Sequence, residues 1–361
     1  MKNPGKPTIR DIAEAAGVSP ATVSLVLNGK GEISGVTRAR VLEAVASLNY
    51  VPRATRNSTE PGETLRFLKI AKHGHTVNRD HSVFISDYID GMSAEATRRN
   101  YTLEVVSFEG QLISSVAESL AGAPISGVIA LGTELTEADI RLIQGLGLPT
   151  VFIDTFYDVL DANFVDMNNE DAVYKVLSHF QKQGFRRIGL VASHVETTNF
   201  RLRRDAFFKN MARLGLSVNQ ADILSVESTY DGAYLDTREL LTNGLDLAEC
   251  YFCTNDIIAY GFIRALREHG IAIPDDVSII GFDNLPQSAT MEPRLTTIDV
   301  SKRKIGYLAV TILNDLIGAA EPQPPVKILV GADLVLRASH ERGAAKTARD
   351  RPPRTMQQPA E

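Results

Sequence analysis

Residues 8–28 have the sequence TIRDIAEAAGVSPATVSLVLN, which predicts two short helices joined by a tight turn. Apolar residues recur at helical spacing at Ile9, Ile12, Ala13 and Ala16. Thr8 is a suitable N-cap for the first helix, and Gly17 is a suitable residue to end it. Ser19 then caps the second helix, with Pro20 at the first helical position, where its missing N–H costs nothing.

This arrangement fits a helix-turn-helix, in which the N-terminal half of the second helix meets base edges in the major groove. We expect Val18 and Val23 to pack against Ile12 and Ala13. The exposed positions of the second helix would be Pro20, Ala21, Thr22, Ser24 and Leu25. A third helix is predicted from about Thr37 to Leu48. A helical hairpin without a DNA role would use the same glycine and cap, so spacing alone leaves both interpretations open.

The chain length and composition are those of a globular protein with two or three domains. It has 361 residues, of which 44% are hydrophobic and 23% are charged. No apolar run approaches the roughly 20 residues that cross a bilayer, and the N-terminus lacks an apolar secretory core. We therefore expect a cytoplasmic protein.

Charge is unevenly distributed along the chain. Residues 1–60 carry eight basic and five acidic side chains, a net of +3, which leaves −9 for the remainder of a chain whose total is −6. A positive N-terminal segment suits attraction to phosphates, although this imbalance also arises by chance. The two cysteines, Cys250 and Cys253, form a C-x-x-C that is a redox pair, half of a zinc site or part of a buried strand. We favour the strand, because no second Cys/His pair stands at metal-ligand spacing.

Beyond a Pro-, Asn- and Gly-containing linker over residues 51–64, apolar runs alternate with amphipathic stretches. Strands are predicted at Phe67–Ala71, Leu103–Ser107, Gly127–Leu131, Thr150–Ile153, Phe164–Asp166, Arg187–Val191, Cys250–Thr254, Val277–Phe282 and Ile328–Val330. Helices are predicted at Phe84–Asn100, Glu137–Gly145, Glu170–Gln183, Arg201–Leu214, Asp256–His269 and Lys302–Leu316. This alternation indicates doubly wound parallel α/β sheets, in two lobes rather than one because of the length. The polar tail over residues 341–361 is expected to be disordered.

The segment from Thr8 to Pro52 resembles, without a gap, the headpiece of the lactose-repressor (LacI/GalR) family. The resemblance continues to about residue 340. Its landmarks are the segment from Arg201 to Phe207, with Ala206 in place of the usual glycine, together with Thr254-Asn255-Asp256, Gly281-Phe282-Asp283-Asn284 and Leu295-Thr296-Thr297-Ile298. It implies an all-α headpiece (1–50), a hinge (51–64) and a periplasmic-binding-protein-like core (65–340). The N-lobe would be residues 65–164 and 287–318, and the C-lobe residues 165–286 and 319–340.

The resemblance also implies where an effector binds. The family's effector contacts correspond here to Asp154, Arg201, Asn255 and Asp283, with Tyr230 near the place of an aromatic platform. Carboxylates, an amide and a guanidinium suit hydroxyl recognition, which implies a sugar-like effector. Each of these residues is otherwise an ordinary surface charge or helix cap.

Three departures from the family pattern bear on specificity. The loop over residues 72–82 is about six residues longer than usual, and we expect Asn78, Arg79, Asp80 or His81 to help bind the effector, with a solvated loop as the alternative. In the hinge, residues 56–59 read RNST instead of A-R-S-L, so the apolar wedge for the minor groove is missing. Leu25 stands where many relatives have arginine, which favours contact with a thymine methyl.

These observations predict a ligand-controlled, homodimeric regulator, by default a repressor, that reads pseudo-palindromic operator DNA. The expected DNA contacts are Thr8, Ile9, Arg10, Ser19, Pro20, Ala21, Thr22, Ser24, Leu25, Asn28, Ser34, Thr37, Tyr50, Arg53 and Arg56. An α/β enzyme or a transport binding protein is the rival interpretation. Phosphate-binding, dinucleotide-binding and nucleophile motifs are missing from the sequence, so no catalytic residue, cofactor, metal site or membrane partner is expected.

Overall fold

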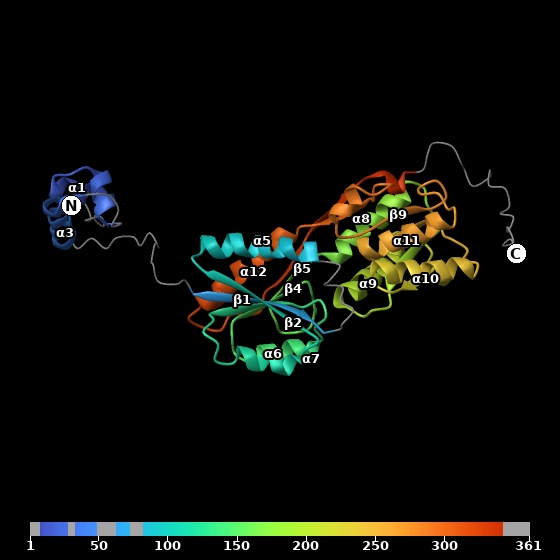
Figure 1. Ribbon diagram of the computed structural model, residues 1–361, viewed down its shortest axis with the longest axis horizontal. Coiled ribbons are helices and arrows are strands. Elements are labelled where there is room, and N and C mark those ends of the chain that lie inside the picture. Colours follow the sequence, from blue (N-terminus) through green and yellow to red (C-terminus); the bar gives the residue numbers. More distant parts are fainter. Residues whose placement is uncertain (1–7, 28–32, 49–62, 73–81, 342–361) are drawn as a thin grey trace. The chain divides into compact units, whose positions relative to one another are not determined.

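The computed structural model describes residues 8–27, 33–48, 63–72 and 82–341 (Figure 1). The chain divides into two compact units, Met1–Pro61 and Gly62–Glu361. Over the described ranges, none of the helices has the length and apolar character that crossing a bilayer requires.

The first unit contains three short helices. They are α1 (Ile9–Ala16), α2 (Pro20–Leu27) and α3 (Gly35–Ser47). Gly17 ends α1 in the left-handed conformation, with φ at 61°, which glycine adopts without steric cost. Ile12, Val23 and Val41, one from each helix, are fully buried in a common core on which Val18 also packs. The predicted packing across the turn is therefore confirmed.

One lobe of the second unit is built on a six-stranded parallel sheet. Its strands, in spatial order, are β11 (Lys327–Val330), β5 (Phe164–Met167), β4 (Thr150–Ile153), β3 (Gly127–Leu131), β1 (Thr64–Ala71) and β2 (Thr102–Glu109). Helices α5 (Ser82–Arg98) and α12 (Lys302–Ile317) cover one face, and α6 (Ile113–Leu120) and α7 (Glu137–Gln144) cover the other (Figure 1). Because neighbouring side chains of a strand alternate in direction, Phe67 joins the core under α5 and α12, while Leu68 joins the core of the opposite face.

The other lobe has a four-stranded parallel sheet. Its strands, in spatial order, are β7 (Ile223–Val226), β6 (Ile188–Ser193), β8 (Cys250–Cys253) and β9 (Ser278–Ile280). Helix α8 (Asn169–Lys182) packs on α9 (Thr198–Arg213), and α10 (Tyr230–Thr242) packs on α11 (Asp256–Glu268). Cys250 and Cys253 are buried free thiols of β8, which confirms the buried strand. Burial raises the pKa of the Cys253 thiol and so disfavours the reactive thiolate.

The boundaries between the lobes differ from those expected. Residues 165–167, expected to open the C-lobe, complete β5 of the six-stranded sheet, and β11 joins that sheet through the pair Lys327↔Phe164. The segment around η2 (Pro286–Ala289) belongs instead with the C-lobe, because Ser288 donates a hydrogen bond to Asp256 of α11. Strand β10 (Thr297–Val300) and strand β12 (Ala332–Val335) form a separate antiparallel pair outside both lobe sheets. Long-range pairing, which no local sequence pattern displays, fixes these boundaries.

Helices α5 and α12 approach each other closely at two glycines. A Cβ on Gly91 would lie 2.1 Å from the Arg303 carbonyl oxygen, and one on Gly306 would lie 2.2 Å from the Tyr88 carbonyl oxygen. Both contacts are with main-chain atoms of the facing helix, which cannot rotate away. Glycine at these positions therefore lets the two helices pack on the sheet at short range.

We expect Gly306→Ala to lower the free energy of unfolding by about 1–3 kcal/mol, because the added methyl forces α5 and α12 apart. Gly318→Ala is the matched control, since its Cβ meets only the Asn314 carbonyl oxygen, at 3.4 Å. Urea unfolding of the two variants measures the difference. Equal stability of both variants would contradict the close packing described here.

Candidate functional site

The N-terminal helices of the first unit are held by side-chain caps. Asp11 accepts hydrogen bonds from the Thr8 N–H (2.6 Å) and the Thr8 hydroxyl (2.7 Å), and these bonds lower the pKa of Asp11. Ser19 Oγ accepts from the Thr22 N–H (3.1 Å), which confirms the cap expected for the second helix. In the same way, Ser34 Oγ accepts from the N–H of Thr37 (3.3 Å) at the start of α3.

The expected DNA contacts that the structure describes lie in all three of these helices and at their caps. Thr8, Ser19, Pro20, Leu25 and Ser34 are exposed, and Thr22 and Thr37 are half-buried. Ile9, Arg10, Ala21 and Ser24 belong to α1 and α2, whereas Asn28, Tyr50, Arg53 and Arg56 lie outside the described residues. The described polar and apolar side chains at the start of α2 are therefore accessible to a partner.

Arg40 is a structural residue that the sequence analysis missed. Its guanidinium donates to the carbonyl oxygens of Ala16 and Gly17, which lie at the C-terminal end of α1. A cation at this end of a helix satisfies carbonyl groups that lack helical partners and complements the helix dipole. Arg40 thus ties α3 to the turn that positions α2.

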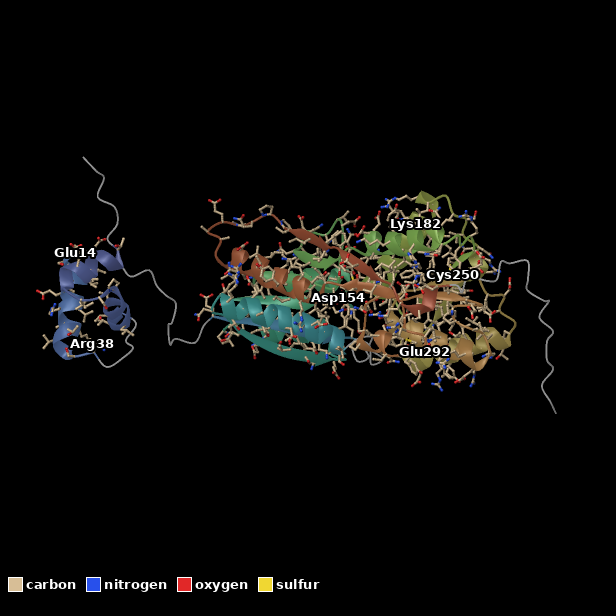
Figure 2. All side chains as sticks on the ribbon, turned by 90° about the horizontal axis from the view of Figure 1, so that it is seen from above. Glu14, Arg38, Asp154, Lys182, Cys250 and Glu292 are labelled. Carbon is tan, nitrogen blue, oxygen red and sulfur yellow. The ribbon has the colours of Figure 1, made fainter. Side chains whose placement is uncertain are left out.

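In the second unit, polar residues from both lobes converge on one small cavity. It has a volume of about 30 Å³ and is lined by Phe84, Ile85, Thr133, Asp154, Thr197, Asn199, Phe200, Arg203, Asn255 and Asp283. Asp154 follows β4 and Asp283 follows β9, so both stand beyond the carboxyl ends of parallel strands, where open α/β sheets hold ligands. Both have positive φ angles, 58° and 113°, a strained backbone that is typical of functional sites. Figure 2 shows Asp154 at the junction of the lobes.

Asp154 is a buried carboxylate held by neutral donors. Oδ1 accepts from the Tyr88 hydroxyl (2.9 Å) and from Asn199 Nδ2 (3.1 Å). Oδ2 accepts from the Thr133 hydroxyl. Burial raises the pKa of Asp154, against the effect of these hydrogen bonds. Burial and the nearby carboxylates also raise the pKa of Tyr88, which keeps its hydroxyl a donor.

Arg203, not Arg201, is the guanidinium of this cavity. Arg203 donates from Nε to Asn169 Oδ1 (3.0 Å) and from Nη1 to the Thr254 carbonyl oxygen (2.7 Å), and it stacks on the Phe282 ring at 3.7 Å. Its Nη2 lies 3.4 Å from Asp283 Oδ1. The side chain of Arg201 is 39% exposed and lies 3.7 Å from Asp205. The expectation for Arg201 misjudged the helix phase.

The other two expected residues are brought into the cavity. Asn255 is buried and caps α11, because its Oδ1 accepts from the Ile258 N–H (2.8 Å). Asp283 is 2% exposed, and its carbonyl oxygen accepts from Lys302 Nζ (2.8 Å). Carboxylate, amide and guanidinium groups from Asp154, Asn255, Asp283 and Arg203 therefore face a shared space. The space between these groups is water-sized as it stands, so a larger polar molecule enters only when the lobes separate, and the same groups can then donate to it and accept from it.

Comparisons with known proteins agree with this architecture. The model of the lacI family of bacterial regulatory proteins matches residues 8–53, and that of the periplasmic binding protein-like domain matches residues 177–340. The HTH-type transcriptional repressor PurR of Photobacterium profundum is 30% identical over 311 residues, which cover 85% of this chain and 91% of that protein. PurR of Pasteurella multocida is 29% identical over 335 residues, covering 92% and 98%.

The chain belongs to the lacI family of bacterial regulatory proteins.

Solved structures of this family have the same fold. A complex of the transcriptional regulator CelR with cellobiose has a TM-score of 0.67 at 23% identity and covers 92% of this chain and 99% of that chain. A Lac repressor dimer bound to operator and the anti-inducer ONPF has a TM-score of 0.68 at 24% identity, with 92% and 98% covered. The lacI-family headpiece makes the chain a DNA-binding transcriptional repressor with an effector-binding core, and not an enzyme.

Next to Asn255, which lines the cavity, Asp256 links α11 of this lacI-family core to the segments between the lobes. Its carboxylate accepts from the Leu285 N–H (2.9 Å), the Ser288 hydroxyl (2.7 Å) and the Thr297 hydroxyl (2.6 Å). Burial raises the pKa of Asp256 to about 7, against these three hydrogen bonds. The contacts made by this one side chain join the C-lobe to β10.

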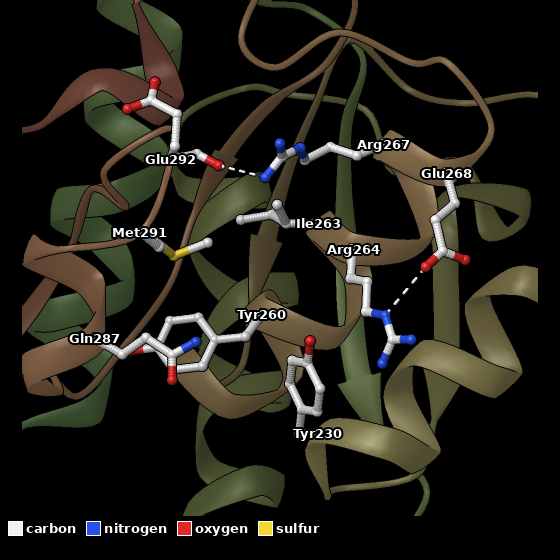
Figure 3. Close-up of a pocket in the computed structure, with 9 residues that line it drawn as sticks. All are labelled: Tyr230, Tyr260, Ile263, Arg264, Arg267, Glu268, Gln287, Met291 and Glu292. Carbon is white, nitrogen blue, oxygen red and sulfur yellow. Dashed lines mark hydrogen bonds and ion pairs between the residues drawn. The ribbon is translucent and has the colours of Figure 1, made fainter.

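Tyr230, expected near the effector, lies elsewhere. It lines a separate pocket of about 530 Å³ together with Tyr260, Ile263, Arg264, Arg267, Glu268, Gln287, Met291 and Glu292 (Figure 3). Its ring lies 5.8 Å from the Arg264 guanidinium carbon, on the side of the C-lobe formed by α10 and α11. Tyr230 begins α10, and the packing of α10 on α11 places it away from the cavity. Asn78, Arg79, Asp80 and His81 lie outside the described residues.

The free energy of unfolding should depend on pH through Asp256. The folded-state pKa of about 7 lies above the ordinary value of 3.8, so folded protein retains a proton that the unfolded chain has released between these values. The contribution of this group to stability is therefore lost as the pH rises through that window, by at most about 1.4 kcal/mol per pH unit.

We expect Asp256→Asn to remove this pH dependence. The free energy of unfolding of the variant minus that of wild type should therefore increase as the pH rises from about 5 to 7. Denaturant unfolding across this pH series tests it. Asp315→Asn, at an exposed position of α12, serves as the control and should follow wild type. Parallel curves for all three proteins would mean that Asp256 is ionised throughout.

Proposed function

We propose that this repressor binds a pseudo-palindromic operator as a homodimer and that a small, sugar-like effector in the cavity between its lobes controls operator affinity. The observation that carries the effector proposal is the convergence of Asp154, Arg203, Asn255 and Asp283, all buried, from both lobes on one cavity. Polyols present paired hydroxyls, which both donate and accept, and this set of carboxylates, amide and guanidinium matches them.

On the DNA side, α2 acts as the recognition helix and α1 supports it. Thr22 and Leu25 stand on its described accessible surface, and Leu25 is 40% exposed. An exposed leucine beside Val23 and Val26, which are buried on the same helix, suits contact with the methyl group of thymine. In the hinge, residues 56–59 lack an apolar wedge, so we expect weak kinking at the operator centre. Bacterial operators lie in the cytoplasm, where the protein acts.

Pairing of two chains supplies the operator contact that a single headpiece of three short helices cannot make. The C-lobe surface in Figure 3 supports such pairing, because Tyr230, Tyr260 and Met291 line its pocket beside Arg264 and Arg267. Aromatic, methionine and arginine side chains are the types enriched at protein interfaces. A pair related by two-fold symmetry presents two headpieces to the two halves of a pseudo-palindrome.

Control by an effector follows from the position of the cavity. A ligand that contacts residues of both lobes favours the lobe arrangement that brings those residues together, and its differential affinity shifts the equilibrium. Residues 78–81, in the loop that is longer than is usual in the family, are proposed to add contacts that set effector choice.

We expect Leu25→Ala to weaken operator affinity by roughly three- to tenfold, through loss of an apolar base contact. Leu42→Ala, at a position of α3 that is 51% exposed, makes the same change outside the recognition helix and should bind normally. Binding is measured on operator DNA selected from a random library by wild-type protein. An equal loss in both variants would argue against a base contact by Leu25.

A titration against neutral sugars, read by melting temperature and by operator affinity together, tests the effector proposal. A true effector raises the melting temperature and changes operator affinity at the same concentration. Arg203→Gln should abolish both responses, whereas Arg201→Gln should keep them, because only Arg203 lines the cavity. If Arg201→Gln lost the responses and Arg203→Gln kept them, this site assignment would be wrong.

A further inference from the structure

The effector cavity holds more buried negative charge than positive charge in the described part of the chain. Asp154, Asp166 and Asp283 are 7%, 0% and 2% exposed, respectively. Asp154 and Asp283 line the cavity, and among the residues that line it Arg203 is the cationic one. Arg203 lies 3.4 Å from Asp283, whereas neither Asp154 nor Asp166 forms an ion pair within 4.0 Å with a described residue.

Asp166 is connected to the cavity wall by two asparagines. Asn169 Nδ2 donates to Asp166 Oδ2 (3.4 Å) and to Asn199 Oδ1 (2.8 Å). Asn199 lines the cavity and donates to the Asp154 carboxylate (3.1 Å). Asp166 thus stands one side chain behind the cavity wall, close enough to Asp154 for each carboxylate to disfavour ionisation of the other.

Asp166 also has unsatisfied hydrogen-bonding capacity. Its Oδ1 is buried and accepts no hydrogen bond from the described residues. Burial, followed by the charge of Asp154, raises the pKa of Asp166 well above its ordinary value. A buried carboxyl group without a cation is stabilised either by keeping a proton or by gaining a positive neighbour.

Lys302 and Arg203, the cations bonded near Asp283, do not offset this excess of buried acidic groups. Lys302 Nζ is bound to the main-chain oxygen of Asp283 (2.8 Å) and lies 4.0 Å from Asp299. The Arg203 guanidinium already contacts Asn169, the Thr254 carbonyl oxygen and Met167 Sδ besides Asp283. Both cations are bonded on the Asp283 side of the cavity. The charge of Arg203 also lowers the pKa of Asp154 and of Asp166, but burial raises both by more, so the Asp154 side keeps an excess of acidic groups.

We infer that the effector carries a cationic nitrogen, an ammonium or amidinium-type group, that binds on the Asp154 side of the cavity, with Asp166 behind the wall favouring its charge. This inference rests on the proposed function, since it names the chemical class of the molecule in the same cavity. An ammonium group donates up to three hydrogen bonds and supplies the charge that a neutral hydroxyl does not. The remainder of the effector is a small polyol, held by Asn255, Asp283 and Arg203.

Matched pairs of ligands test this class. Full-length protein is titrated with glucose against glucosamine and galactose against galactosamine, at about pH 6.5 so that the amine is protonated. We expect the amine of at least one pair to bind roughly tenfold or more tightly than its neutral partner, as one favourable charge contact in a partly buried site predicts. The same amine should change operator affinity.

Asp166→Asn is the informative variant, because it removes the charge without changing the residues that line the cavity. It should reduce the preference for the amine to within about threefold and leave binding of the neutral sugar unaltered. Asp205→Asn, whose carboxylate is 59% exposed on α9, removes the same charge elsewhere and should keep the preference. If Asp166→Asn fails to fold, calorimetry of wild type in buffers of different ionisation enthalpy replaces it. Amine binding should release a proton at neutral pH, and neutral sugars should not.

The outcomes separate this inference from the proposed function. If a neutral sugar binds, shifts operator affinity and exceeds its amine partner, the cationic class is wrong while control by a sugar stands. If the amine preference persists unchanged in Asp166→Asn and no proton is released, the role of Asp166 is wrong. If neither member of any pair raises the melting temperature or affects operator binding, both the cationic class and the sugar-like effector are overturned.

Discussion

The guanidinium of Arg203 connects the segments of the core that surround the cavity, and these segments come from both lobes. It emerges from α9, bonds Asn169 at the start of α8 and the Thr254 carbonyl oxygen after β8, and stacks on Phe282 beside Asp283. Its contact with Met167 reaches β5 of the other lobe. A planar group with five donors can satisfy several partners at once, which a lysine cannot do. Removing it would leave a carbonyl, an amide and a carboxylate buried without their donor.

The Arg203 contacts explain why the polar groups of the cavity tolerate burial. Asp283 has a guanidinium beside it, whereas Asp154 depends on the hydroxyls of Tyr88 and Thr133 and the amide of Asn199. Neutral donors stabilise a carboxylate less than a cation does. The ionised carboxylate of Asp154 is therefore less stabilised by its bonded neighbours than that of Asp283. The cavity is thus polarised along its length, a property that can orient an asymmetric ligand.

Much of this architecture could be predicted from the sequence, since strands buried on both faces read as continuous apolar runs. Strands β3 and β4 end at the expected residues, and the turn at Gly17 follows from one glycine. Helix α10, by contrast, was missed, because its sequence from Tyr230 is polar with a glycine in the first turn. Arg201 and Arg203 are two residues apart on one helix, so only the phase of α9, fixed by packing, distinguishes them.

Residues that line the cavity are followed directly in the chain by residues that bind the segments between the lobes. Asn255 lines the cavity, and the next residue, Asp256, binds the Leu285 N–H and the Ser288 and Thr297 hydroxyls. On the other side of the cavity, Asp283 is followed by Asn284, which bonds Asp299 of β10 (3.0 Å). Any shift of the α11 N-terminus that improves contact with a ligand therefore changes the hydrogen bonds to these segments. A buried carboxylate with several donors does not move by small increments, because each lost bond leaves a buried group unpaired. Such a network favours two discrete arrangements over a continuous range. Control by an effector requires a two-state element of this kind.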